Sequence, residues 1–179
     1  MTDTAALREI RTNYPRFCEI AVSLQWAEAV CIFDYHQSSR YPNGCNVYAV
    51  RFSAGDVQAH LPERFLQALL MRNADFEGWE PDFWQIPAHE RAQWLTDCAP
   101  ELRRAFLLTA LRMQPLDADT LLQDIAEYSG NKSLPGPALQ VIRSGESIEL
   151  GGDAWYPVDH EVLTVTPDTI LLTEYGVWD

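Results

Sequence analysis

Basic residues are the scarcest class of side chain in this sequence. Its 179 residues include 13 Lys and Arg against 26 Asp and Glu, which gives a formal net charge of −13. From Met113 onward the only cations are Lys132 and Arg143, and none occurs from Ser144 to Asp179. Such a charge repels nucleic-acid phosphate and anionic membrane surfaces and attracts cationic surfaces. We therefore expect a basic protein partner, no nucleic-acid partner and no membrane partner.

Cysteine is also sparse, and no two cysteines are spaced as CxxC. Cys18, Cys31, Cys45 and Cys98 are typical of free thiols in a cytosolic protein more than of a disulfide framework. The N-terminus lacks the basic flank and apolar core of a signal peptide, and no apolar run reaches membrane-spanning length. These absences predict a cytoplasmic protein. A chain of this length needs no disulfide or metal to fold, and we expect no cofactor.

The common catalytic motifs are absent as well. The sequence contains no GxSxG, GxxxxGK[ST], GxGxxG, HExxH or EF-hand loop. This excludes the strongly patterned classes of enzyme, although it does not exclude enzymes in general. We therefore assign no catalytic, cofactor-binding or metal-binding residue from the sequence.

Two histidine groupings keep a small hydrolase or a metal-dependent enzyme open as an alternative. Asp34 and His36 would lie on one face at the end of a strand, where a third ligand such as His60 or Asp56 could complete a metal site. His160 follows Asp159 at the start of another strand, and a histidine beside carboxylates can act as a base. A solvated turn explains the second grouping more simply, and the first lacks a third ligand nearby in the sequence.

The hydrophobic pattern predicts an α+β fold. Helices are expected over residues 4–11, 15–28, 62–73, from Pro87, 100–113 and 117–128. Strands are expected over residues 29–35, 47–52, 139–142, 147–150, 161–166 and 169–175, with a loop over 36–46. This order predicts a largely antiparallel sheet from an N-terminal hairpin and C-terminal strands, with a helical middle segment. Whether the early and late strands share one sheet is left open.

The length predicts a single α+β domain over residues 1–179. The clearest linker is residues 131–137, which contain two prolines and a glycine and mark a possible sub-boundary.

One stretch combines acidic and aromatic side chains densely. Residues 74–84 carry four carboxylates and four large rings, and no Lys or Arg lies between Arg72 and Arg91. Unpaired buried charges are costly, and exposed rings usually cover a partner. We expect the rings to face inward or onto a partner, with the carboxylates in solvent. The predicted partner-binding residues of this stretch are Asp75, Phe76, Glu77, Trp79, Glu80, Asp82 and Trp84.

A second candidate surface is an acidic edge of the C-terminal sheet. Its predicted partner-binding residues are Asp153, Trp155, Tyr156, Asp159 and Glu161. Carboxylates speed association with a cationic cleft, and desolvated Trp and Tyr supply affinity. The hypothesis we favour is a bacterial immunity- or antitoxin-type inhibitor that caps a basic partner such as a cognate toxin. A subunit of a larger assembly is a further alternative, which would present an exposed apolar face.

Overall fold

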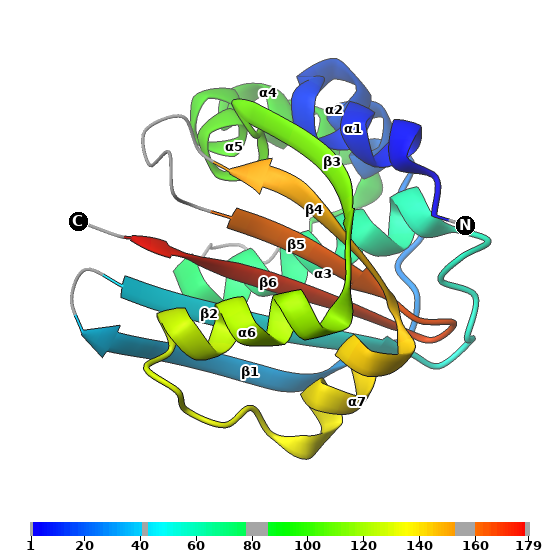
Figure 1. Ribbon diagram of the computed structural model, residues 1–179. Helices are drawn as coiled ribbons and strands as arrows, with labels where there is room; N and C mark the ends of the chain where they lie inside the picture. Colours follow the sequence, from blue (N-terminus) through cyan, green and yellow to red (C-terminus); the bar gives the residue numbers. More distant parts are fainter. Residues whose placement is uncertain (1, 41–42, 78–85, 153–159, 178–179) are drawn as a thin grey trace. The chain divides into compact units, whose positions relative to one another are not determined.

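A computed structural model describes residues 2–40, 43–77, 86–152 and 160–177. Within these ranges the chain forms seven helices and a six-stranded antiparallel sheet, so the predicted α+β class is confirmed (Figure 1). The chain divides into two compact units. Unit 1 consists of residues 1–2, 28–59 and 108–179, and unit 2 of residues 3–27 and 60–107. The predicted linker at 131–137 lies inside unit 1, and the single-domain assignment stays a prediction.

Unit 1 contains the whole sheet. Its strands are β1 (Ala29–Arg40), β2 (Asn43–Phe52), β3 (Ala110–Leu116), β4 (Glu146–Gly152), β5 (His160–Val165) and β6 (Thr169–Val177). They are ordered β1-β2-β6-β5-β4-β3, with every neighbouring pair antiparallel. The N-terminal hairpin and the C-terminal strands therefore share one sheet, because β2 pairs directly with β6.

Two helices of unit 1, α6 (Ala118–Tyr128) and α7 (Gly136–Ser144), pack on one face of this sheet (Figure 1). Asp117 caps α6, since its carboxylate accepts a hydrogen bond from the backbone N–H of Thr120. Gly130, just past the end of α6, has the positive φ (72°) that favours glycine there. Apolar residues of α6, α7, β2, β5 and β6 form one buried cluster, which includes Val47, Leu121, Ile125, Ile142, Val162 and Leu171.

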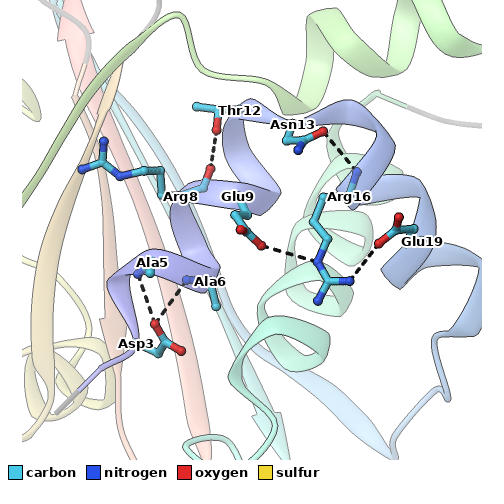
Figure 2. Close-up of polar contacts among 9 residues, drawn as sticks. All are labelled: Asp3, Ala5, Ala6, Arg8, Glu9, Thr12, Asn13, Arg16 and Glu19. Atoms are coloured by element: carbon cyan, nitrogen blue, oxygen red, sulfur yellow. Dashed lines mark hydrogen bonds and ion pairs between the residues drawn. The ribbon is translucent and has the colours of Figure 1, made fainter.

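Unit 2 is helical. Its elements are α1 (Thr4–Thr12), α2 (Tyr14–Ser23), α3 (Leu61–Glu77), α4 (Ala88–Asp97) and α5 (Ala99–Phe106). Side-chain caps start the first two helices, Asp3 for α1 and Asn13 for α2 (Figure 2). Arg16 of α2 forms an ion pair with Glu9 of α1 at 3.5 Å and another with Glu19 of its own helix at 2.9 Å.

The core of unit 2 includes a pair of aromatic rings. The rings of Phe17 and Phe106 lie 5.1 Å apart, and both side chains are fully buried. The guanidinium of Arg11, also buried, donates to the backbone carbonyl of Phe106. Tyr14 donates its hydroxyl to the carbonyl of Leu95 at 2.5 Å. These hydrogen bonds satisfy polar groups that would otherwise be costly to bury.

Two segments have a different secondary structure from the one predicted. Residues 110–113 were expected to continue a helix, but α5 ends at Phe106 and residues 110–116 form β3, which pairs with β4. Residues 139–142 were expected to form a strand, but they lie in α7 and bury Ala138, Val141 and Ile142 at helical spacing. Both are short apolar runs, for which periodicity alone does not separate helix from strand.

Three predicted boundaries are also wrong. The helix expected over 15–28 ends at Ser23. The expected loop over 36–46 is largely strand, because β1 continues to Arg40 and β2 begins at Asn43. The helix expected over 62–73 extends to Glu77. In the part of the chain that the structure describes, no helix combines the length and the apolar character that crossing a membrane requires.

Candidate functional site

A connected group of polar side chains lies at one end of the sheet in unit 1. Four neighbouring strands each contribute one residue: Arg112 from β3, Glu149 from β4, His160 from β5 and Tyr175 from β6. Asp124 of α6 completes the group through Tyr175. We call these five residues the polar cluster. Because Tyr175 belongs to the apolar cluster under α6 and α7, the polar cluster adjoins that core.

An acid–base pair lies at the centre of the polar cluster. The Nδ1 atom of His160 is 2.7 Å from Oε1 of Glu149, and the side chains are 24% and 14% exposed. Arg112 forms an ion pair with the same carboxylate, and its Nη1 is 2.8 Å from Nδ1 of His160. Nδ1 cannot both donate to Glu149 and accept from Arg112. A proton on Nδ1 directed at the carboxylate leaves Arg112 to pair with Glu149.

Tyr175 of the polar cluster packs against His160 and is hydrogen-bonded to α6. The rings of His160 and Tyr175 are stacked, with centroids 4.8 Å apart and an interplanar angle of 10°. The hydroxyl of Tyr175 donates to Oδ2 of Asp124 at 2.9 Å, and the ring of Tyr128 lies 5.3 Å away. Burial, followed by the Asp124 carboxylate, raises the pKa of Tyr175 far above its ordinary value. The phenol therefore stays protonated and keeps its hydrogen bond through the neutral range.

Irregularities in two strands shape the backbone around the polar cluster. The β3–β4 register shifts between Leu111 and Gln114, where Met113 has a φ of 53°. The β4–β5 register shifts between Glu149 and Gly151, and Gly151 has a φ of 142°. Such bulges redirect nearby side chains and are common beside functional sites. Here they flank Arg112 and Glu149 directly.

The polar cluster can hold or transfer a proton, but its contacts include no nucleophile. The partners of His160 in the described ranges are an arginine, a carboxylate and a phenol ring, with no Ser, Thr or Cys side chain among them. Among the described residues, no group of three or more His, Cys, Asp or Glu is arranged to hold a metal ion. The arrangement is that of an anchored ion-pair network. It lies close to the end of β4 at Gly152 and to the start of β5 at His160.

Most of the predicted partner-binding residues lie outside the described part of the chain. Of the first stretch, Asp75, Phe76 and Glu77 belong to the last turn of α3 by their backbone, and their side chains are not described. The predictions that lie outside the described residues altogether are Trp79, Glu80, Asp82, Trp84, Asp153, Trp155, Tyr156 and Asp159. Their role in partner binding stays a prediction.

Glu161 is the one predicted partner-binding residue whose side chain is described. We expected it at an acidic sheet edge, but β5 lies between β4 and β6, and Glu161 is only 5% exposed. The expectation of a sheet edge is therefore wrong, because the edge strands are β1 and β3. The role of Glu161 in partner binding stays a prediction.

The structure describes only part of each of the two histidine groupings that could have formed an enzyme site. Asp34 is exposed on β1, but the side chain of His36 is not described. His60 belongs to unit 2, whereas Asp34 belongs to unit 1. For His160 the carboxylate within reach is Glu149, which the sequence reasoning missed. The two residues are 11 positions apart and meet only through the β4–β5 pairing. The sequence could therefore have predicted their contact only if the register of these strands had been known.

The Tyr175→Phe variant, which lacks the hydroxyl, should lose less unfolding free energy than the wild type as the pH rises in the alkaline range. Above pH ~10, the ordinary pKa of tyrosine, the unfolded chain releases this proton while the native state keeps it. The raised pKa therefore stabilises the native state below pH 10, and that contribution is lost as pH rises. The wild type should lose up to about 1.4 kcal/mol per pH unit more than the variant between pH ~10 and ~11. Urea unfolding followed by circular dichroism at several pH values measures this difference. Equal slopes would contradict the assignment.

Comparison with known proteins identified no relative: no protein-family model matches the chain, and no significant match was found among curated proteins or solved structures.

Proposed function

We propose that this protein is an acidic protein-binding domain, an immunity- or antitoxin-type inhibitor that caps a basic partner such as a bacterial toxin. The observation that carries the proposal is the separation of charge along the chain. No Lys or Arg occurs from Met113 to Asn131, a segment that includes all of α6. A surface with one sign of charge steers an oppositely charged partner into contact and raises the rate of association.

The acidic residues of α6 divide into two kinds. Asp117 caps the helix, and Asp124 accepts the hydrogen bond from Tyr175, so both have structural roles. Asp119 and Glu127 are exposed and form no ion pair among the described residues. Glu127 also lies in the last turn, where a negative charge opposes the helix dipole and costs a few tenths of a kcal/mol. Helix stability does not account for this carboxylate, whereas attraction of a cationic partner does.

The polar cluster supports the same proposal. Its ion pairs and stacked rings anchor β4 and β5 close to the two ends of the 153–159 connection, which carries the second predicted surface. A rigid base lowers the conformational entropy lost when such a segment binds. The contact between His160 and Glu149 favours the hydrolase alternative, but a hydrolase would also require a nucleophile or a metal at that position.

The proposal is tested by capturing and then reconstituting the partner. The tagged protein is incubated with lysate at low salt, the retained basic proteins are identified, and each is purified for titration calorimetry. Raising the salt from about 50 mM to about 500 mM should weaken the complex at least tenfold, because screening shortens the reach of charges. The double variant Glu80→Gln/Asp82→Asn should also bind about tenfold more weakly.

The matched control is Glu9→Gln/Glu19→Gln, which removes the same charge from unit 2. These two carboxylates already pair with Arg16, so their loss should change the affinity by less than about threefold (Figure 2). Binding that is insensitive to salt, or equally weakened by both double variants, would refute recognition through the predicted surface. Catalytic turnover that disappears in His160→Gln would favour the hydrolase alternative.

A further inference from the structure

A groove lies between one side of α7, the turn from β5 to β6 and the end of β2, all within unit 1. It has a volume of about 440 Å³. Four residues of α7 line it at helical spacing and so form one stripe along the helix: Pro137, Gln140, Val141 and Ser144. Pro167 lines it from the β5–β6 turn. Pockets for small ligands commonly combine apolar walls with a few polar groups, at volumes from roughly 300 Å³ upward.

The groove presents one cation and one carboxylate side by side. Among the described residues that line it, Arg51 is the single basic residue and Asp168 the single acidic one. Nε of Arg51 lies 3.7 Å from Oδ2 of Asp168, which is too long for a hydrogen bond, and the two side chains are 52% and 49% exposed. An ion pair of this length and exposure contributes little stability. A ligand that carries both charges can therefore replace this contact at little cost.

Both members of the ion pair have bonding capacity for a ligand. The guanidinium of Arg51 has five N–H donors, and its ion pair with Asp168 is its one polar contact in the described part of the chain. Oδ1 of Asp168 accepts hydrogen bonds from the hydroxyls of Thr169 at 2.8 Å and Thr166 at 3.0 Å. These bonds orient the carboxylate and lower its pKa, so it stays charged at neutral pH. Oδ2, which is directed at Arg51, can accept from a ligand.

Apolar surface adjoins the charged pair. Val141 of α7 lines the groove and is almost fully buried in the protein. Val30 of β1 lies directly opposite Arg51 in the β1–β2 pairing, so the two side chains share one face of the sheet, and Val30 is 55% exposed. A ligand with an apolar group beside its charges would gain free energy by covering this surface.

We infer that this groove binds an apolar α-amino acid, with its carboxylate at Arg51, its ammonium at Asp168 and its side chain against Val141 and the two prolines. An α-amino acid carries both charges on one carbon, which matches a cation and a carboxylate 3.7 Å apart. At about 30 Å³ for each water-sized group, a groove of this volume holds about fifteen non-hydrogen atoms. L-phenylalanine is slightly smaller than this, and we use it as the probe. The inference is independent of the protein partner proposed above.

The binding test is a titration of the isotope-labelled protein with L-phenylalanine, followed by amide chemical shifts. Amides of Arg51, of α7 and of residues 168–169 should shift in a saturable manner, and the rest of unit 1 should change little. Hydrocinnamate lacks the ammonium, phenethylamine lacks the carboxylate and glycine lacks the apolar side chain. Each of these should bind at least about fivefold more weakly, because each loses one charge contact or the apolar contact. Shifts spread over the whole surface, or equal affinity for any of the three compounds, would overturn the inference.

Charge variants test each member of the ion pair. Arg51→Gln should weaken L-phenylalanine binding by roughly fivefold but should not weaken phenethylamine, which has no carboxylate. Asp168→Asn should weaken L-phenylalanine by a similar factor but should not weaken hydrocinnamate, which has no ammonium.

The matched control is Arg143→Gln, which removes an exposed cation of α7 that does not line this groove. Its affinity for L-phenylalanine should stay within about twofold of the wild type. If Arg51→Gln weakens phenethylamine as much as L-phenylalanine, or if neither groove variant changes L-phenylalanine binding, the ion pair does not recognise the ligand and the inference fails.

Discussion

Replacing Gly151 with alanine is expected to destabilise the protein by about 3–5 kcal/mol, close to the upper end for a single substitution. A Cβ added at this position would lie 1.9 Å from the carbonyl oxygen of Ala110, an atom of the β3 backbone. The φ of 142° is also one that residues with a side chain rarely adopt. Relief of the contact requires β3 to move away from β4, which breaks their hydrogen bonds.

Two other glycines provide matched controls for this substitution. Gly55 has a φ of 63° but nothing within 4 Å of an added Cβ, so Gly55→Ala should cost only about 1–2 kcal/mol of backbone strain. Gly136 starts α7 with open space and no positive φ, so Gly136→Ala should be neutral or stabilise by up to about 1 kcal/mol. Urea unfolding of the three variants measures this order. A Gly151→Ala protein as stable as Gly136→Ala would refute the close approach of β3 to β4.

Truncating Phe106 to alanine is expected to cost about 3–5 kcal/mol, the range for removing a buried aromatic ring. Phe106 is fully buried, and its ring contacts that of Phe17. The helices of unit 2 cannot close over the space without moving the Arg11 guanidinium, which donates to the backbone carbonyl of Phe106. A cavity therefore remains, and its lining loses dispersion contacts.

The double variant Phe17→Ala/Phe106→Ala separates this local effect from a general loss of stability. Because the two rings are in contact, the cost of the double variant should be at least about 0.5 kcal/mol less than the sum of the single costs. The control Val22→Ala, at a side chain 36% exposed in the same unit, should cost less than about 1 kcal/mol. Thermal unfolding followed by near-ultraviolet circular dichroism gives all four values. Strict additivity of the two phenylalanines would contradict their contact.

Local sequence signals predicted those elements that depend on local interactions. The helices over 15–28 and 117–128 were predicted from apolar helical patterns, and each starts after a short polar side chain, Asn13 or Asp117, that accepts a hydrogen bond from one of the first N–H groups. The strands β5 and β6, which pair with each other, were predicted from two β-rich runs on either side of Pro167 and Asp168. These features need only a few neighbouring residues, so they can be found without the fold.

Features that depend on distant partners were not predicted. Residues 110–116 become a strand because β4, more than 30 positions later, offers unpaired backbone groups, and this pairing overrides their helical pattern. The contact between His160 and Glu149 depends in the same way on the β4–β5 register and its bulge. The acidic and aromatic composition of the candidate surfaces was evident in the sequence. Their geometry could not follow from composition.

The position of β2 between β1 and β6 has a consequence for how the molecule forms during synthesis. β1 and β2 are made early, but the other neighbour of β2 is the last strand in the chain. The early hairpin therefore emerges from the ribosome with one edge unpaired and waits while more than a hundred further residues are added. Long-range pairing of this kind slows folding, and an open strand edge is the usual point of misassembly. The nascent chain is thus most vulnerable to aggregation in the interval before β6 is complete.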